Sequence, residues 1–300
     1  MSKPSILSCG EVLWDLFPEG AQFGGAAANF ACHAALLGGD VTLLSAVGAD
    51  ARGDEAIAIL RGFGIATSLI QRNADAATGS VGVSLDMAGK PSFEIHADSA
   101  WDRVVWTGAL DARVANVDAV YFGTLGQRGE KSRATIRQAL RLAKDRGILR
   151  VLDVNLRKPF YDGALIRDSI ALASVLKLSD DELPEVAAAC GIALDAKPEN
   201  TLRALLVRSG LDLVAMTRGA DGALLVSKDD AVSQPGIPTK VVDTVGAGDS
   251  FTAALVIGLL RGEPHKSILR KACEIASAVC SHSGAVPQSD KSPNRTRTEK

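Results

Sequence analysis

Short apolar runs alternate with longer helix-like segments along most of this chain. The runs 41–47 and 149–153 have the length of buried strands, whereas the segments 51–61 and 131–146 have the length of helices. Strands that alternate with helices are typical of βαβ units and of a parallel sheet. The pattern therefore predicts an α/β fold with a doubly wound, mostly parallel sheet flanked by helices. Further strands are expected at residues 5–9, 12–17, 119–122, 175–178, 213–216, 223–226 and 239–242, and further helices are expected to end at residues 37, 189, 260 and 281.

The alternation changes between residues 78 and 96. Apolar and polar residues alternate from 81 to 87, and a turn at 88–90 leads to a second run through Phe93 and Ile95. A period of two with polar partners predicts a half-exposed antiparallel hairpin. Such an insertion is either a plain edge hairpin or a lid that closes over a site and excludes water. An exposed hairpin of this kind could also pair across a homodimer.

A glycine-rich turn at residues 243–251 precedes the almost wholly apolar segment 252–260. A helix that is apolar on nearly every face is normally buried. Gly246 and Gly248 permit a tight turn and close approach to a ligand, and the first N–H groups of a helix bind anions. Asp249 lies in the first turn, where the helix dipole is expected to favour the ionised carboxylate. A carboxylate beside an anion hole suits deprotonation of a hydroxyl that attacks a phosphoryl group.

A plainer interpretation of this turn is a helix cap, because Asp is a favoured capping residue and glycine turns are common. Two other phosphate-binding motifs are excluded. A dinucleotide-binding fingerprint needs a small residue where Phe251 stands. A Walker A loop needs Gly-Lys-Ser or Gly-Lys-Thr, which the chain lacks.

Two other segments carry candidate site residues. Gly24 and Gly25 open a helix of small residues, and Asn29 follows in its first turn. These residues could contact a ligand, or they could form only a turn that allows close helix packing. Asn155 and Arg157 follow the strand predicted at 149–153, where ligands of open α/β sheets bind. An arginine there can neutralise phosphate, although a salt-bridged loop is the alternative.

Composition narrows the class of protein. The chain has 300 residues, of which 47% are apolar and 23% charged, with a net charge of −2. These values are ordinary for a globular protein and suggest neither a nucleic-acid nor a membrane partner. The five cysteines are scattered without a Cys-x-x-Cys, and the four histidines form no metal-binding pattern. The residues thus predict reduced thiols, no zinc site, no catalytic histidine, no signal peptide and a cytoplasmic location.

The motif at 243–251 is long and resembles the C-terminal signature of the ribokinase-like (PfkB) carbohydrate kinases. The resemblance implies that Asp249 is the general base and that the preceding glycines form the anion hole. The Gly-Gly-x-x-x-Asn at 24–29 is similar to the N-terminal signature of the family, where these residues contact the sugar. The resemblance implies the following roles: Asp249, Gly246, Ala247, Gly248 and Arg157 in catalysis, and Asp15, Gly24, Gly25, Asn29 and Asn155 in sugar binding.

Cofactor sites also follow from the resemblance. It implies ATP and Mg²⁺, with K⁺ as an additional cation. Nucleotide contacts are expected from Thr217, Gly219, Gly222, Thr244 and Ala285. Glu182 is expected in the magnesium network, acting through water, and Asp243 at the monovalent cation. The chain departs from its relatives at Ser179, where the family usually has Asn, and at Cys273, where Asn is frequent near adenine.

Taken together, these residues predict an ATP-dependent sugar kinase. Segments around Glu11 and Thr124 resemble the fructokinase branch, which implies that D-fructose is converted to fructose 6-phosphate. A kinase for another ketose, a pentose or a nucleoside remains open, as does a catalytically silent sugar-binding protein of the same fold. We expect one kinase domain over residues 1–290, a lid at 78–98 joined by 12–24, and a mobile polar tail at 291–300.

Overall fold

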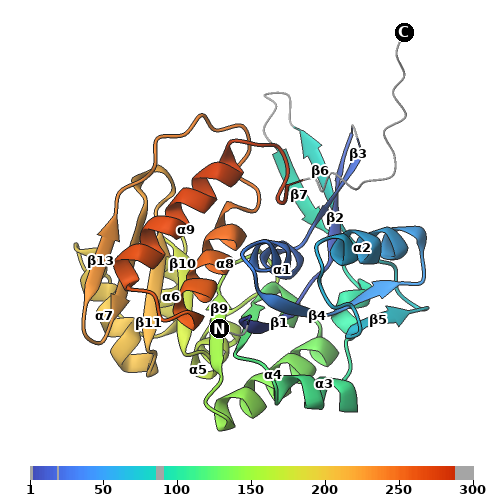
Figure 1. Cartoon of the computed structure of the whole chain (residues 1–300), viewed down its shortest axis with the longest axis horizontal. Coiled ribbons are helices and arrows are strands. Elements are labelled where there is room, and N and C mark those ends of the chain that lie inside the picture. Colours follow the sequence, from blue (N-terminus) through green and yellow to red (C-terminus); the bar gives the residue numbers. More distant parts are fainter. Residues whose placement is uncertain (1–2, 19, 86–90, 288–300) are drawn as a thin grey trace.

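The computed structural model describes residues 3–18, 20–85 and 91–287. Its main element is a nine-stranded sheet with the order β13-β12-β11-β10-β9-β8-β1-β4-β5 (Figure 1). The strands from β11 to β5 are parallel, and β12 and β13 add an antiparallel edge. The strands are β1 (Ser5–Cys9), β4 (Asp40–Gly48), β5 (Ile70–Asn73), β8 (Ala119–Gly123), β9 (Leu149–Asp153), β10 (Val175–Ser179), β11 (Leu213–Thr217), β12 (Ala223–Ser227) and β13 (Ala231–Gln234).

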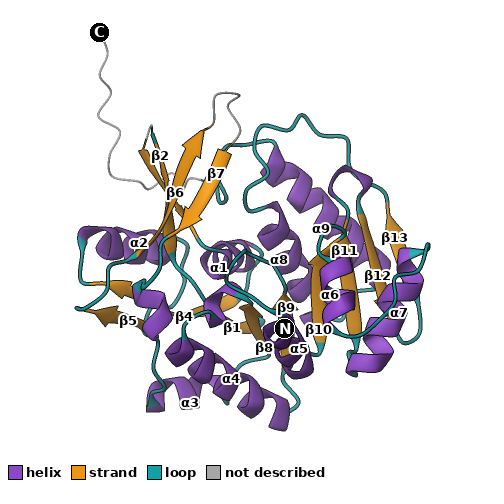
Figure 2. Ribbon diagram, turned by 180° about the vertical axis from the view of Figure 1, so that it is seen from behind, coloured by secondary structure: helices purple, strands orange, loops and turns teal. Residues whose placement is uncertain are grey.

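Nine helices among the described residues cover both faces of this sheet. The first group is α1 (Ala26–Leu36), α2 (Ala51–Gly62), α8 (Ala247–Leu260) and α9 (His265–Cys280). The second group is α3 (Gly108–Val114), α4 (Glu130–Asp145), α5 (Gly163–Leu172), α6 (Leu183–Ala189) and α7 (Pro198–Ser209). Figures 1 and 2 show the two groups from opposite sides. The predicted doubly wound fold is therefore confirmed.

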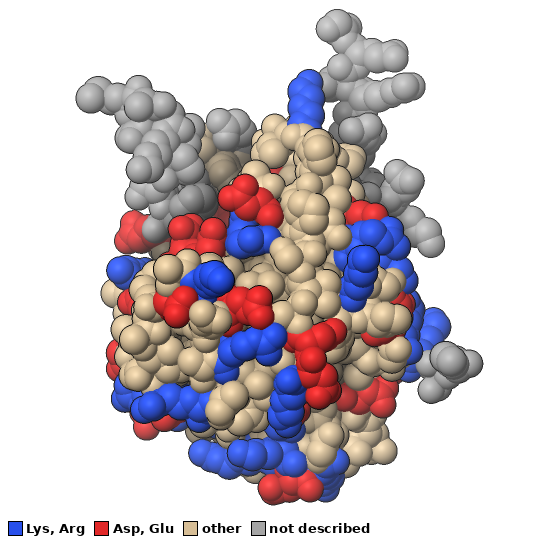
Figure 3. Space-filling model, turned by 90° about the vertical axis from the view of Figure 1, so that its left-hand side faces the viewer, with Lys and Arg blue, Asp and Glu red and all other residues tan. Residues whose placement is uncertain are grey.

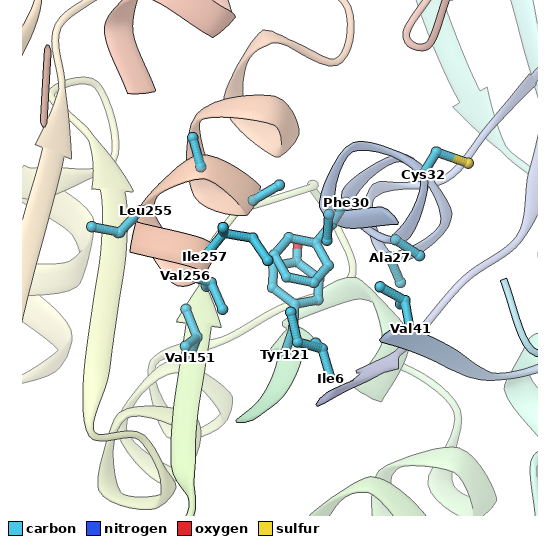
Figure 4. Close-up of a cluster of buried hydrophobic side chains, with 14 of the residues drawn as sticks. Ile6, Ala27, Phe30, Cys32, Val41, Tyr121, Val151, Leu255, Val256 and Ile257 are labelled. Carbon is cyan, nitrogen blue, oxygen red and sulfur yellow. The ribbon is translucent and has the colours of Figure 1, made fainter. Parts of the chain in front are cut away.

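Most strands of the nine-stranded sheet contribute side chains to two separate cores. Ile6 of β1 packs with α1 and α8, whereas its neighbour Leu7 packs with the helices of the second group. Because strand side chains alternate and both faces are covered, these strands consist mainly of apolar residues. In the first core, Phe30 of α1 stacks on Tyr121 of β8 with ring centroids 3.8 Å apart (Figure 4).

The chain reverses its direction of sheet growth between β1 and β8. From β1 it first adds β4 and β5 on one side, and it then returns to add β8 and the later strands on the other. A ligand crevice is expected at such a switch point, outside the carboxyl ends of the strands. The segments that follow β1, β8 and β9 all reach this edge.

A second sheet stands out from the body at the top of Figure 1. Its order is β3-β2-β6-β7, formed by β3 (Gly20–Gly24), β2 (Leu13–Phe17), β6 (Gly79–Leu85) and β7 (Pro91–Ile95). β6 and β7 are antiparallel, as predicted for the hairpin, and β6 pairs with β2, which precedes α1. Thr78 anchors the start of β6, because its N–H and hydroxyl donate to Asp50 at distances of 2.8 and 2.6 Å.

The prediction of a strand at 239–242 is wrong. These residues form an irregular segment, and Val241 and Val242 are each 60% exposed. The N–H groups of Val242 and Asp243 donate to Cys280 at the end of α9 instead of to a neighbouring strand. β-propensity alone suggested this strand, but propensity yields to tertiary context, and here the described backbone bonds lead to α9. The turn predicted at 88–90 and the tail predicted at 291–300 lie outside the described residues.

The structure also shows the charges on one face of the molecule, the state of the cysteines and the character of the helices. On the face displayed in Figure 3, Lys and Arg side chains are interspersed with Asp and Glu. All five cysteines are free. No helix within the described ranges has the length and apolar character needed to cross a membrane.

Candidate active site

The glycine turn before α8 is held in a conformation that only glycine adopts easily. Gly246 has φ 79° and ψ −6°, in the left-handed region. A Cβ atom at Gly246 would lie 2.4 Å from the carbonyl oxygen of Ala285, so the loop after α9 presses directly on the turn. The side chain of Asp243 joins the same two segments, because it accepts hydrogen bonds from the N–H groups of Val245 and Gly284.

The first turn of α8 offers unpaired hydrogen-bond donors. Ala247 N–H bonds to Thr244 and Ser250 N–H bonds to Gly246. Within the described residues, the N–H groups of Gly248 and Asp249 have no hydrogen-bond acceptor. Two free N–H groups at the positive end of a helix form an anion-binding site. Of the anion hole predicted at Gly246, Ala247 and Gly248, the Gly248 N–H is one of these free donors, whereas the Ala247 N–H is paired with Thr244.

Asp249 lies beside these donors and is 8% exposed. Its Oδ2 accepts a hydrogen bond of 2.9 Å from Nδ2 of Asn29, at the start of α1. Burial raises the pKa of the Asp249 carboxyl above its ordinary value, and the bond from Asn29 together with the charges of Lys177 and Arg157 offsets part of that rise. Burial is thus the largest cause of the shift, even though Asp249 lies at a helix N-terminus, where the dipole favours the ionised form.

Asp15 and Arg157 flank the same region. Burial raises the pKa of Asp15 to about 6, and the nearby charge of Arg157 opposes this rise. A Cβ at Gly24 would lie 2.8 Å from Oδ2 of Asp15, so this glycine leaves room for the carboxylate. Arg157 itself is exposed and also lowers the pKa of Asp249. The structure thus brings these predicted residues into one electrostatic environment.

A pocket lies at the switch point between β1 and β8. Glu11 is buried there, and its Oε1 accepts a 3.0 Å hydrogen bond from Ala26 N–H at the start of α1. Gly25 permits this approach, since a Cβ there would lie 2.6 Å from the carbonyl oxygen of Glu11. The lining residues are Glu11, Ala26, Ala27, Tyr121, Gly123, Thr124, Leu125 and Asn155.

Two buried polar atoms in this region have no partner among the described residues. They are Oδ1 of Asn29 and the hydroxyl of Tyr121. An unsatisfied buried polar atom costs about 1–3 kcal/mol, so each is ready to bond a hydroxyl of a ligand. Tyr121 was not predicted as a site residue, although a tyrosine within the apolar run 119–122 was a visible signal.

Glu182 connects two strand ends. Its carboxylate accepts from Leu156 N–H at 2.7 Å and from Ser179 N–H at 2.8 Å. The Ser179 hydroxyl accepts in return from Glu182 N–H at 3.3 Å, so it caps the turn that leads into α6. Asn155, two residues beyond β9, has a φ of 40°, which is uncommon for a residue other than glycine.

The turn at 217–222, where nucleotide contacts were predicted, follows β11, which lies on the opposite side of β10 from β9. It connects β11 to β12, and Thr217 accepts a hydrogen bond from Asp180 N–H. A Cβ at Gly222 would lie 2.1 Å from the carbonyl oxygen of Gln234, which explains the glycine. Among the described hydrogen bonds, this turn reaches the Ser179–Glu182 segment but not Asn29 or Asp249.

Known proteins are similar to this chain in sequence and in fold. The model of the pfkB family carbohydrate kinases matches residues 20–292. "Probable fructokinase-5" of Arabidopsis thaliana is 28% identical over 311 residues, covering 95% of this chain and 94% of its own. The aminoimidazole riboside kinase of Salmonella typhimurium is 29% identical over 262 residues, covering 84% of this chain and 80% of its own.

Solved structures share the architecture. A fructokinase from Xylella fastidiosa with bound ATP has a TM-score of 0.83 at 23% identity, with 95% of this chain and 94% of that one covered. A putative ribokinase II from E. coli in complex with ATP and Mg²⁺ has a TM-score of 0.81 at 21% identity, with 95% and 94% covered. The family match extends over both glycine turns and over most of the pocket and the small sheet, whereas Glu11 and β2 precede it. The chain belongs to the pfkB family of carbohydrate kinases and is an ATP-dependent sugar kinase.

Proposed function

We propose that this protein phosphorylates D-fructose to fructose 6-phosphate, with Asp249 as the general base. The observation that carries the catalytic assignment is the buried Asp249 carboxylate beside the free N–H groups of Gly248 and Asp249. Its raised pKa suits a base, because a stronger base takes the proton of a hydroxyl more readily. Asn29 holds the carboxylate in place through a 2.9 Å hydrogen bond.

The residues present fit the nucleotide and its metal. When bound, ATP supplies the phosphoryl group and Mg²⁺ offsets part of its charge. The N–H groups of Gly248 and Asp249 and the exposed Arg157 would bind anionic oxygens. Thr244, Ala285 and the 217–222 turn would contact the nucleotide. The Glu182 carboxylate accepts hydrogen bonds from two backbone N–H groups, which fix its position. It would therefore hold Mg²⁺ through water, an arrangement common for this ion. Asp243 joins the loops where a monovalent cation such as K⁺ would bind.

An uncharged acceptor fits the charges of the pocket. Glu11 lines it, and Asp249 lies close enough for its charge to raise the pKa of Glu11. Asp15 and Asp249 share the nearby charge of Arg157, and of these acids Asp249 would receive the proton of the acceptor hydroxyl. Carboxylates accept hydrogen bonds from sugar hydroxyls but repel a phosphorylated or acidic sugar. Similarity to fructokinases favours fructose among neutral sugars. The small sheet, with its β6–β7 hairpin, would close over this site as a lid.

A panel of acceptors tests the proposal. Purified protein is assayed with ATP, Mg²⁺ and D-fructose, D-ribose, adenosine, aminoimidazole riboside or fructose 6-phosphate, and the product is identified by ³¹P and ¹³C NMR. We expect the largest kcat/KM for fructose, with the phosphate on C6. A larger value for ribose or for either riboside would contradict the choice of fructose, and the absence of ATP turnover with every sugar would favour a silent sugar-binding protein.

A further inference from the structure

Lys177 is a buried cation in an otherwise apolar strand. It lies near the end of β10, on the face covered by α8, and its side chain is 7% exposed. Its ammonium is 3.1 Å from both carboxylate oxygens of Asp153, whose side chain is 1% exposed. Removing two charges from water costs several kcal/mol per ion unless the geometry compensates. An apolar residue at position 177 would avoid this desolvation cost, so the presence of the buried pair calls for a functional explanation.

The Lys177–Asp153 pair is bonded to the first turns of α8. Oδ2 of Asp153 accepts a 2.9 Å hydrogen bond from the hydroxyl of Thr252. The same hydroxyl also lies 2.8 Å from the carbonyl oxygen of Gly248, so its single hydrogen is shared between these two acceptors. A continuous polar network therefore runs from the ends of β9 and β10 to the backbone of the anion hole.

The ammonium also lies directly against this turn. A Cβ atom at Gly248 would be 3.0 Å from Nζ of Lys177, so only glycine leaves the ammonium in its present place. The N–H groups of Gly248 and Asp249 remain free on this turn. A positive charge this close in a buried environment raises the potential at those donors more than it would in water. Helix ends alone supply only partial charges.

We propose that Lys177 is a positioning residue for phosphoryl transfer, whose buried ammonium, anchored by Asp153, strengthens the anion hole at Gly246–Gly248 and fixes the first turn of α8. The proposal rests on the assignment of that turn as the anion hole and adds a full charge to it. Lys177 touches neither the sugar nor the nucleotide in this assignment and acts through the α8 backbone.

Lys177 also acts on the base. Its charge lowers the pKa of the Asp249 carboxyl, against the larger effect of burial. The other groups that face Asp249 are Asn29 and Arg157, which also lower its pKa, and Asp153, Glu11 and the hydroxyl of Tyr121. Lys177 and Asp153 thus act on the pKa of Asp249 in opposite directions, so removing both charges together tests the anion hole with little net change of charge near the base.

The test removes both charges together. Lys177→Met alone would leave Asp153 buried without its partner, but the double variant K177M/D153N is neutral, and such replacements often preserve folding. The matched control is K228M/D212N, which removes the exposed Lys228–Asp212 pair. Thermal unfolding establishes that each protein is folded. Calorimetry then measures binding of ADP alone, and of ADP with Mg²⁺, aluminium fluoride and the best sugar of the panel, a mimic of the transferring phosphoryl group.

We expect K177M/D153N to bind the aluminium fluoride complex at least about 10-fold more weakly and to lose kcat by a similar factor, which is less than the ~10²–10³-fold cost of removing a direct donor. Affinity for ADP alone and KM for the sugar should stay within about threefold. The control should match the wild type in every measurement.

Two results would overturn the proposal. One is a folded double variant with wild-type affinity for the aluminium fluoride complex and wild-type kcat. The other is equal weakening of ADP alone and of the complex, which would indicate general damage to the nucleotide site. Neither result depends on which sugar is the substrate. An active Asp249→Asn variant would instead contradict the assignment of the base.

Discussion

Two glycine turns in this protein open two neighbouring buried helices, yet they provide opposite electrostatic environments. Gly25 precedes α1 and Gly246 precedes α8, both with positive φ, and the two helices pack against each other in the first core. At α1 the carboxylate of Glu11 accepts from the first N–H group. At α8 the N–H groups of Gly248 and Asp249 remain free within the described structure.

The difference separates two kinds of ligand. A carboxylate at the start of α1 repels anions and accepts hydrogen bonds, which suits a neutral, hydroxyl-rich molecule. Free donors at the start of α8 suit an anion. Asn29 and Asp249, each in the first turn of its helix, are joined by a hydrogen bond where the two environments meet. That meeting point is where a sugar hydroxyl and a phosphoryl group must come together.

The strongest test of this comparison exchanges acid for amide at each helix. Asp249→Asn keeps an acceptor for Asn29 but removes the base, so we expect kcat to fall ~10²–10⁴-fold. The matched change at α1, Glu11→Gln, should raise KM for the sugar while kcat changes less. Steady-state kinetics with each substrate varied in turn measures both. Equal effects of the two variants on kcat would contradict the assignment of the base to α8 and of sugar binding to the start of α1.

Asp15 extends the neutral-ligand side of the comparison. We expect Asp15→Ala to lower kcat/KM for fructose at least ~100-fold, about 2.7 kcal/mol, because a site built to pair a hydroxyl loses its partner. KM for ATP should change little. If ATP and fructose were weakened alike, Asp15 would support the fold or the small sheet and would not bind the sugar.

The two glycines can also be compared directly. Alanine at either position would strain a positive φ and contact backbone, at 2.4 Å from Ala285 for Gly246 and at 2.6 Å from Glu11 for Gly25. Overpacking of this kind costs about 1–3 kcal/mol, or roughly 5- to 150-fold. Gly246→Ala should raise KM for ATP, and Gly25→Ala should raise KM for the sugar. Gly64→Ala, at an open position with φ 76°, controls for backbone strain alone.

The pH dependence of sugar binding should report on Asp15, which belongs to the neutral-ligand side of the comparison. The pKa of Asp15 is raised to about 6, so this carboxyl takes up a proton as the pH falls through 6 and loses its charge. Calorimetry on the Asp249→Asn protein, in which the base no longer titrates, should show sugar affinity falling about 10-fold from pH 7 to pH 5. The same fall in an additional Asp15→Asn variant would assign the titration to another group.

The smallest expected effect concerns the small sheet. If it closes as a lid over the neutral ligand, saturating sugar should slow amide hydrogen exchange severalfold in β6 and β7, whereas ADP alone should not. Mass-spectrometric exchange of peptides covering 79–85 and 91–95 measures this. Unchanged exchange with sugar would leave the hairpin as an ordinary edge structure.

Local patterns in the sequence were sufficient for most of the elements. Residue periodicity predicted the parallel strands other than β5 and the β6–β7 hairpin, and the glycine turn indicated that α8 begins with free donors, one of which is the Gly248 N–H. Other elements could have been found by the same means. Helix α7 was not predicted, although Pro198 begins it and Leu202, Leu205 and Leu206 follow at helical spacing.

Tertiary structure alone decided which distant side chains meet. Asn29 and Asp249 are 220 residues apart in the chain, and their hydrogen bond exists because α1 and α8 pack side by side. Lys177 and Asp153 pair because parallel register places them opposite each other on β10 and β9. The segment 239–242 is irregular despite its propensity, and its described backbone bonds lead to the end of α9. Helix and turn signals are local, whereas strand register, burial and the pKa values that burial shifts are properties of the assembled fold.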